Sequence, residues 1–176
     1  MRMATVILDA GHGGWDNGAT YAGRREKDDN LAMVLAVGEI LSQSGVNVLF
    51  TRVTDIYESP IQKARDANNS GADYMISIHR NSSPIANQYA GVETLVYSLY
   101  GPAMRMAENI NASLAQVGYN NLGIEARPNL VVLNSTNMPA LLVEVGFLNS
   151  DEDNYLFDTF FDETAQAIAT GILQSL

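Results

Sequence analysis

Two patterns of hydrophobic and polar residues alternate along the chain. Short apolar runs rich in branched side chains predict buried β-strands, and stretches in which apolar residues recur every three or four positions predict amphipathic helices. The strand pattern occupies residues 4–9, 46–50, 73–79, 91–98, 129–133 and 140–145. The helical pattern runs from Leu31 to a stop signal at Ser44-Gly45 and also occupies residues 59–70, 103–117 and 161–173.

This alternation predicts the fold class. Strands and helices that follow one another from end to end are typical of an α/β fold, in which a largely parallel twisted sheet has helices on both faces. The fourth and fifth strands are the candidates for breaking the parallel order. The chain has 176 residues and shows no internal repeat or Pro/Ser-rich linker, so we expect a single domain over residues 1–176.

The composition narrows the function classes. Hydrophobic residues make up 47% and charged residues 17% of the chain, as in ordinary folded proteins. The net charge of −10 argues against a nucleic-acid partner, because binding phosphates requires clustered Lys and Arg. No apolar run reaches the ~18 residues of a membrane span, so we expect no membrane insertion. The absence of cysteine excludes disulfides and thiolate metal sites.

Both histidines of the chain lie at predicted strand ends. His12 follows the first strand within a glycine-rich stretch, Gly11-His12-Gly13-Gly14, and His79 ends the third strand. In open α/β sheets, ligands bind outside the carboxyl ends of the strands. One such histidine is more often a packed or hydrogen-bonded residue than a ligand, but two in equivalent positions favour a shared functional site.

Carboxylates near these histidines extend the candidate site. Glu144 interrupts the apolar strand 140–145, where a carboxylate must be paired, metal-bound, neutral or able to reach solvent. Glu26 lies in a run of charged residues, a pattern that by itself indicates a solvated surface. Asp9 and Glu93 are weaker candidates, and Asp9 is a possible partner that orients an imidazole.

Two imidazoles and one carboxylate, with water as the fourth ligand, form a hydrolytic zinc site in which a second carboxylate acts as general base. The residues alone do not decide whether Glu26 or Glu144 is the ligand. A rival interpretation is a phosphate-binding loop, since Gly11-x-Gly13 begins a dinucleotide fingerprint. Asp16 stands where its third glycine belongs, so we reject that interpretation.

A set of motifs, in order over essentially the whole chain, resembles the zinc-dependent N-acetylmuramoyl-L-alanine amidases of the amidase-3 type. The motifs are LDAGHGG at 8–14, a glutamate ahead of NLA, Thr51-Arg52, SIHxNS at 77–82, GVET at 91–94 and MPALLVEVGFLNS at 138–150. The resemblance implies a mixed, mainly parallel sheet of about six strands. It also implies hydrolysis of the amide between N-acetylmuramic acid and the L-alanine of the peptidoglycan stem peptide.

The resemblance assigns roles that the residue pattern left open. It implies one Zn²⁺ per chain held by His12, Glu26 and His79, with Glu144 as the catalytic glutamate. Asn81 is then expected at the substrate rim. The alternatives are a non-catalytic peptidoglycan-binding module on the same fold and a zinc peptidase that acts on the stem peptide.

Two positions depart from the family pattern. Arg80 stands where the family commonly has alanine, and we interpret it either as a solvated loop residue or as a contact for a stem-peptide carboxylate. The family's usual Arg-Gly is Leu122-Gly123 here, which leaves Arg127 as a candidate substrate-facing cation or a plain surface charge.

The resemblance and the charge together suggest a setting. The enzyme would act outside the cell at the bacterial wall, yet a chain of net charge −10 is repelled by anionic wall polymers. We therefore expect a wall-binding module or a recruiting partner outside this chain. The N-terminal residues carry no signal-peptide pattern, which fits an excised domain, a mature form or a phage lysin.

Overall fold

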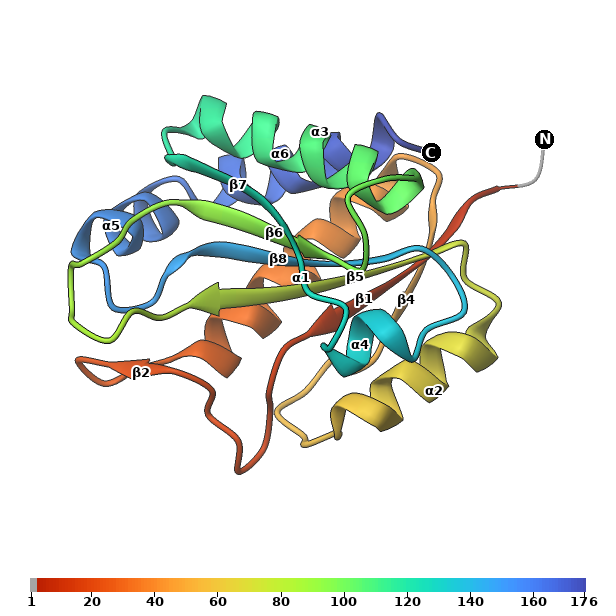
Figure 1. Cartoon of the computed structure of the whole chain (residues 1–176), viewed down its shortest axis with the longest axis horizontal. Coiled ribbons are helices and arrows are strands. Elements are labelled where there is room, and N and C mark those ends of the chain that lie inside the picture. Colours follow the sequence, from red (N-terminus) through yellow and green to blue (C-terminus); the bar gives the residue numbers. More distant parts are fainter. Residues whose placement is uncertain (1–2) are drawn as a thin grey trace.

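A six-stranded sheet runs through the middle of the molecule in the computed structural model, which describes residues 3–176 (Figure 1). The strand order is β4-β1-β5-β8-β6-β7. The first four strands in this order are parallel, β6 is antiparallel to β8, and β7 is parallel to β6. The bounds are β1 Thr5–Ala10, β4 Asn47–Phe50, β5 Tyr74–Asn81, β6 Val92–Val96, β7 Asn121–Ala126 and β8 Ala140–Phe147. This mixed, mainly parallel sheet confirms the predicted fold class.

Helices cover the two faces of the sheet unequally. The larger core lies under α1, α3 and α6, and the smaller core under α2 and α4 (Figure 1). α5 follows the carboxyl end of β8. The bounds are α1 Glu26–Gln43, α2 Pro60–Ser70, α3 Pro102–Val117, α4 Val131–Asn134, α5 Asp151–Thr159 and α6 Phe161–Leu173. Among residues 3–176, no helix has the length and apolar character that crossing a membrane requires.

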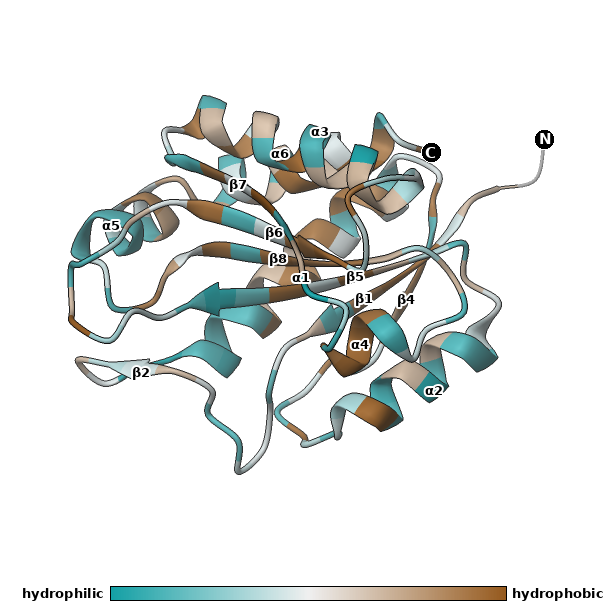
Figure 2. Ribbon diagram, viewed as in Figure 1, coloured by the Kyte–Doolittle hydropathy of each residue, from teal (hydrophilic) through white to brown (hydrophobic). Residues whose placement is uncertain are grey.

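The smaller core stops partway along the sheet, and polar residues continue the same face. Side chains of a strand alternate between faces, so residues two apart share a face. Ile7, Met75 and Leu142 belong to the apolar core, and the residues two positions later are Asp9, Ser77 and Glu144. β5 accordingly changes from hydrophobic to hydrophilic toward its carboxyl end (Figure 2). The polar half of this face carries the site described below.

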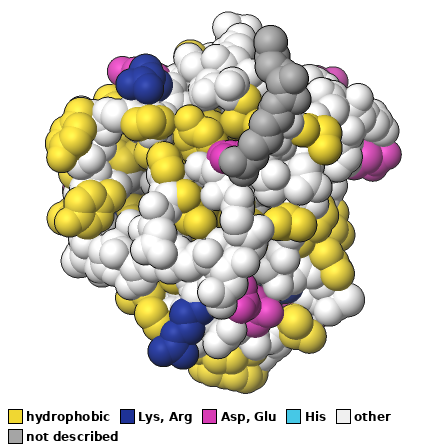
Figure 3. Space-filling view, turned by 90° about the vertical axis from the view of Figure 1, so that its right-hand side faces the viewer, with side chains coloured by type: hydrophobic (Ala, Val, Ile, Leu, Met, Phe, Trp, Pro, Cys, Tyr) yellow, Lys and Arg dark blue, Asp and Glu magenta, His cyan; other side chains and the backbone are white. Residues whose placement is uncertain are grey.

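The end of the molecule opposite the polar half of the sheet shows no histidine among its described surface residues. Figure 3 views the side on which β1 begins and the C-terminus lies, and hydrophobic side chains are scattered across it. Both histidines therefore lie away from this end of the sheet, in agreement with their positions after β1 and near the end of β5.

Local sequence signals explain both ends of α2. The Ser59 side chain caps its start by accepting a hydrogen bond from the Gln62 amide, and Pro60 begins the helix, but the Gln62 side chain bonds Asp66 and does not complete a capping box. Gly71 ends α2 in the left-handed conformation. α1 begins at Glu26, five residues before the apolar stripe that predicted it.

One predicted strand is wrong. Residues 129–133 lie largely in α4, where Val132 and Leu133 pack against the smaller core, and the strand in this region is β7. A five-residue apolar run does not distinguish a buried strand from one buried helical turn, because all side chains of such a short segment can be buried in either structure. The pattern also missed α5 and a short hairpin of β2 Thr20–Tyr21 and β3 Arg24–Arg25.

Candidate metal centre

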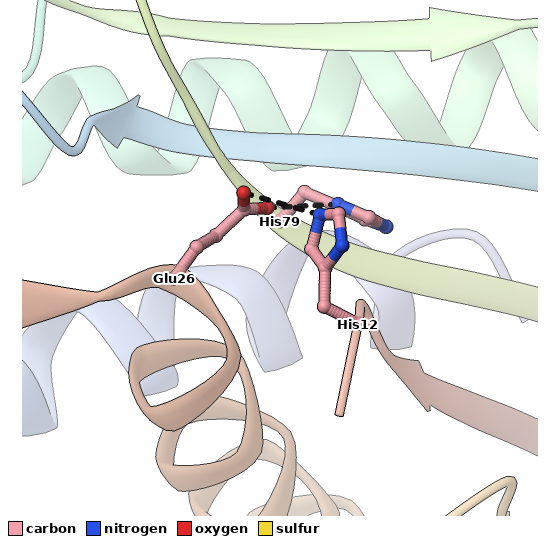
Figure 4. A group of neighbouring side chains, drawn as sticks. All are labelled: His12, Glu26 and His79. Atoms are coloured by element: carbon pink, nitrogen blue, oxygen red, sulfur yellow. Dashed lines mark hydrogen bonds and ion pairs between the residues drawn. The ribbon is translucent and has the colours of Figure 1, made fainter. Parts of the chain in front are cut away.

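Three side chains from separate segments meet beside the polar half of the sheet. His12 follows β1, Glu26 opens α1 and His79 lies in β5, and one ligand atom from each falls within 4.8 Å of the others (Figure 4). His12 Nε2 lies 3.1 Å from Glu26 Oε2, and His79 Nδ1 lies 2.9 Å from Glu26 Oε1. The structure therefore brings together all three residues that the sequence nominated as metal ligands.

Glu26 is a buried carboxylate at the first turn of a helix. Its oxygens accept hydrogen bonds from the Ala19 amide at 2.9 Å, the Arg80 amide at 3.2 Å and the Asn30 side chain at 3.3 Å. Burial alone would raise the pKa of Glu26, but the hydrogen bonds and charges of the two imidazoles outweigh it and hold the pKa well below its usual range. The Glu26 carboxylate is therefore ionised, and the charge run in the sequence is not a solvated surface here.

His12 is held in an uncommon backbone conformation by a neighbouring carboxylate. Its φ is 60°, in the left-handed region, and its Nδ1 lies 2.8 Å from Asp16 Oδ2. Partial burial lowers the pKa of His12, yet the bonds to Glu26 and Asp16 prevail and raise it to about 9. Because Asp16 bonds Nδ1, the Nε2 atom of the His12 ring is the one that faces Glu26 and can bind a metal ion.

Asp16 contacts the candidate site through His12, and the sequence pattern did not identify it. It entered the sequence reasoning only as the residue that spoils a dinucleotide fingerprint. The available signal was a carboxylate four residues after a histidine in a glycine-rich turn, and the Gly13–Asp16 bridge closes that turn.

Two glycines permit the close approach of the ligands. A Cβ at Gly11 would overlap the His79 ring, and a Cβ at Gly18 would overlap both His12 and Glu26. Gly18 also has a φ of 65°, which an L side chain rarely adopts. Gly11 and Gly18 therefore make room for the imidazoles rather than for a phosphate.

Two buried cations hold the backbone beneath His12. Arg52 donates to the carbonyl oxygens of Ala10 at 3.1 Å and Gly11 at 3.0 Å, and to Lys27 of α1 at 2.9 Å. Lys63 of α2 donates to the Ala10 oxygen at 2.7 Å. These bonds tie the end of β1, the loop after β4 and the start of α1 into one unit.

The suggestion that Asp9 orients an imidazole is wrong. Its oxygens bond Lys63 at 2.8 Å, Ser77 at 2.6 Å and Thr51 at 2.7 Å, beneath the site. Burial opposes ionisation, but the Lys63 ammonium and these hydrogen bonds lower the pKa of Asp9. Asp9 is the buried counter-charge of Lys63, because a lone ammonium in the interior would be unstable.

Glu144 lies beside His79 in the sheet, and one of its carboxylate oxygens makes no hydrogen bond to the described residues. In the sheet it is in register with His79 of β5 on one side and with Glu93 of β6 on the other. Within residues 3–176, its Oε2 is closed to solvent and has no hydrogen-bond partner. Burial raises the pKa of Glu144 to about 7, with a smaller contribution from the charges of Glu26 and Glu93. A carboxyl group with this pKa can both accept and release a proton near neutrality.

The two candidate rim residues lie at different places on the sheet. Asn81, at the end of β5, donates to Glu93 at 3.4 Å. Arg127 follows β7, is half-exposed and pairs with Glu125 at 2.8 Å. Their roles as substrate contacts stay predictions.

The structure contradicts both interpretations of Arg80, which were a solvated loop residue and a contact for a stem-peptide carboxylate. Its side chain is fully buried, pairs with Asp29, donates to Asn154 Oδ1 at 2.8 Å and stacks on Phe157 at 4.3 Å from the ring centroid. β5 continues through residue 81, so Arg80 points to the face opposite His79. α5, which the sequence did not predict, encloses it there.

A family model for N-acetylmuramoyl-L-alanine amidases matches residues 6–174. The chain belongs to this family. It is 36% identical to an endolysin of Bacillus phage SPP1, over 97% of this chain and 65% of the endolysin. It is 35% identical to a sporulation-specific N-acetylmuramoyl-L-alanine amidase of Bacillus subtilis strain 168, over 98% of this chain and 68% of that protein. The chain therefore spans about two thirds of the length of these relatives.

Solved structures of the family share the whole fold. The crystal structure of an N-acetylmuramoyl-L-alanine amidase from Clostridium difficile 630 superposes with a TM-score of 0.91 at 33% identity, covering 98% of this chain and 96% of that one. The six-stranded sheet with helices on both faces is thus the architecture of this amidase family.

The donor set of this amidase domain fits a divalent metal ion. Two imidazole nitrogens and one carboxylate oxygen converge without a competing cation among them, and a carboxylate fixes one ring from behind. The chain can therefore hold a metal ion at His12, Glu26 and His79.

Asp16→Ala is expected to weaken metal binding. Without its carboxylate the His12 ring loses the bond that orients it, and loss of such a partner typically lowers metal affinity ~10–100-fold. Competition for Zn²⁺ with a chromogenic chelator measures the change. Asp28→Ala, which removes an exposed carboxylate of α1 that pairs with Arg25 of β3, is the matched control. Equal affinity in Asp16→Ala and the parent would contradict the role of Asp16.

Arg80→Ala is expected to lower the free energy of unfolding by ~3 kcal/mol, because it removes one member of a buried ion pair. Urea denaturation measures this, and the exposed Arg105→Ala on α3 should change stability by less than ~0.5 kcal/mol. Unchanged stability together with a raised KM would instead restore Arg80 as a substrate contact.

Proposed function

We propose that this domain hydrolyses the amide bond between N-acetylmuramic acid and the L-alanine of the peptidoglycan stem peptide. His12, Glu26 and His79 hold a single Zn²⁺, and Glu144 is the general base and acid. The observation that carries the proposal is the unpartnered Oε2 of Glu144, in register with His79 beside a group able to hold a metal. Family membership and the names of the relatives support the same activity.

The residues divide the work by their environment. Zinc held by His12, Glu26 and His79 would supply a bound water with a pKa lowered to about 7 and would polarise the scissile carbonyl. Glu26, whose pKa is depressed, stays ionised as a ligand. Glu144, whose pKa is raised to about 7, accepts a proton from the attacking water and then donates it to the nitrogen of the leaving amine. One carboxylate thus serves as ligand and the other as proton carrier.

The setting follows from the charge of the chain and the lengths of its relatives. The substrate is part of the bacterial wall, so the proposed site of action is outside the cytoplasmic membrane. A net charge of −10 disfavours unaided adhesion to anionic wall polymers. The relatives extend beyond the matched region, which is consistent with a wall-binding module or a recruiting partner outside this span.

Removal of the metal tests the reaction. A chelator should abolish release of stem peptides from purified wall, and added Zn²⁺ should restore it. Mass spectrometry of the products should find stem peptides with a free L-alanine amine and intact glycan strands. Full activity of metal-free protein would refute the zinc site. Cleavage within the stem peptide would identify a peptidase, and binding without any release would identify a non-catalytic module.

Glu144→Gln tests the proton carrier. The amide keeps the shape of the side chain but cannot move a proton, so kcat should fall by ~10²–10⁴-fold. Bound Zn²⁺, counted per chain by elemental analysis, should stay near that of the parent. Glu108→Gln, an exposed position on α3, should keep the parental kcat. A parental rate in Glu144→Gln would eliminate Glu144 as base and acid.

A further inference from the structure

An exposed pair of aromatic side chains lies on the loop that carries His12 and on the segment between β4 and α2. Trp15 is 75% exposed and Tyr57 is 38% exposed, and their ring centroids lie 4.3 Å apart. Trp15 follows His12 by three residues, so their Cα atoms lie within about 11 Å of each other. The next residue, Asp16, contacts the His12 ring. We call Trp15 and Tyr57 the aromatic pair.

The backbone that carries the aromatic pair is fixed from several sides. Gly13 and Asp16 exchange two backbone hydrogen bonds, at 3.0 and 3.1 Å, which close a tight turn with Trp15 at its tip. The Gly14 amide donates to Asp55 at 2.7 Å, and the Lys27 ammonium donates to the Gly14 oxygen at 2.6 Å. A rigid loop that holds a large apolar ring in solvent is typical of a binding surface, because exposure of such a ring gains nothing for the fold.

The charges around the aromatic pair favour an uncharged ligand. Asp16, Asp55 and Glu58 adjoin it in sequence or by hydrogen bond. The nearby cations are both buried: Lys27 pairs with Asp55 at 2.7 Å, and Arg52 donates to the carbonyl oxygens of Ala10 and Thr54. A stem peptide carries carboxylates and would be repelled there, whereas a neutral N-acetylated sugar has an apolar C–H face that stacks on an indole ring.

We propose that the aromatic pair binds an uncharged N-acetylhexosamine of the glycan strand, next to the sugar whose lactyl amide is cleaved. This inference rests on the proposed function, which places a glycan at this rim. Trp15 stacks on the sugar, and Tyr57 supports the indole from behind. The aromatic pair thereby makes the domain prefer polymeric glycan over a single muramoyl peptide.

The chain's single tryptophan provides a direct readout. Triacetylchitotriose, an uncharged N-acetylglucosamine trimer, is titrated into the Glu144→Gln protein while Trp15 fluorescence is recorded. A saturable blue shift is expected, because the sugar covers an exposed indole. A free stem tetrapeptide should cause no such shift. No saturable change with the trimer, or a change with the tetrapeptide alone, would overturn the proposal.

A kinetic comparison supplies the second arm. In Trp15→Ala, the ratio of kcat/KM for solubilised polymeric glycan to that for a single muramoyl peptide should fall about tenfold, through KM, as expected for loss of one stacking contact. Tyr100→Ala, a 77% exposed aromatic after β6, should leave the ratio unchanged. An unchanged ratio in Trp15→Ala contradicts the aromatic pair's role. If the parent cleaves neither substrate, the proposed function fails, and the fluorescence titration alone decides the sugar site.

Discussion

Burial of the Glu26 carboxylate is the constraint on which the site depends. A negative charge inside a protein is stable only when hydrogen bonds and opposite charges replace the water it loses. Here three N–H donors and two imidazoles surround it, and they come from the loop after β1, from α1 and from β5. These three segments must therefore converge, and the same convergence aligns the atoms that can hold a metal ion.

Buried cations hold the strained backbone of the loop after β1 in place. His12 adopts a left-handed backbone conformation, which a non-glycine residue keeps only where its surroundings enforce it. Arg52 and Lys63 bind the carbonyl oxygens just before it, and Asp9 balances the charge of Lys63. This support requires two desolvated cations, and it anchors the backbone just before His12 through its carbonyl oxygens.

The side chains of each strand alternate between two faces of the sheet, and the two faces differ in what they carry. On one face the strands bury a large apolar core under α1, α3 and α6. On the other face the apolar residues give way to Asp9, His79 and Glu144 beyond the cover of α2 and α4. Arg80 shows the rule within one strand, because it lies next to His79 in sequence and yet belongs to the opposite, structural face.

Local patterns were sufficient for much of the molecule. Short apolar runs predicted five of the six sheet strands, and apolar residues at helical spacing predicted the helices α1, α2, α3 and α6, because both patterns record which side chains are buried. The placement of His12 and His79 at strand ends and of Glu144 in an apolar strand also came from the residues. The strand predicted at residues 129–133 was wrong because a short apolar run is compatible with a strand or with one buried helical turn, and α5 was missed because Asp151–Thr159 carries no apolar stripe.

Residue patterns alone were enough for the α/β class and for the two histidines at strand ends, and the motifs were enough for the family. The three-dimensional arrangement was needed to show that Glu26 is buried between two imidazoles and is not a surface charge, that Asp16 bonds the His12 ring, and that Arg80 faces the core. The reason is physical. The environment of a charged side chain is set by segments distant in sequence, and no local pattern records which of them will surround it.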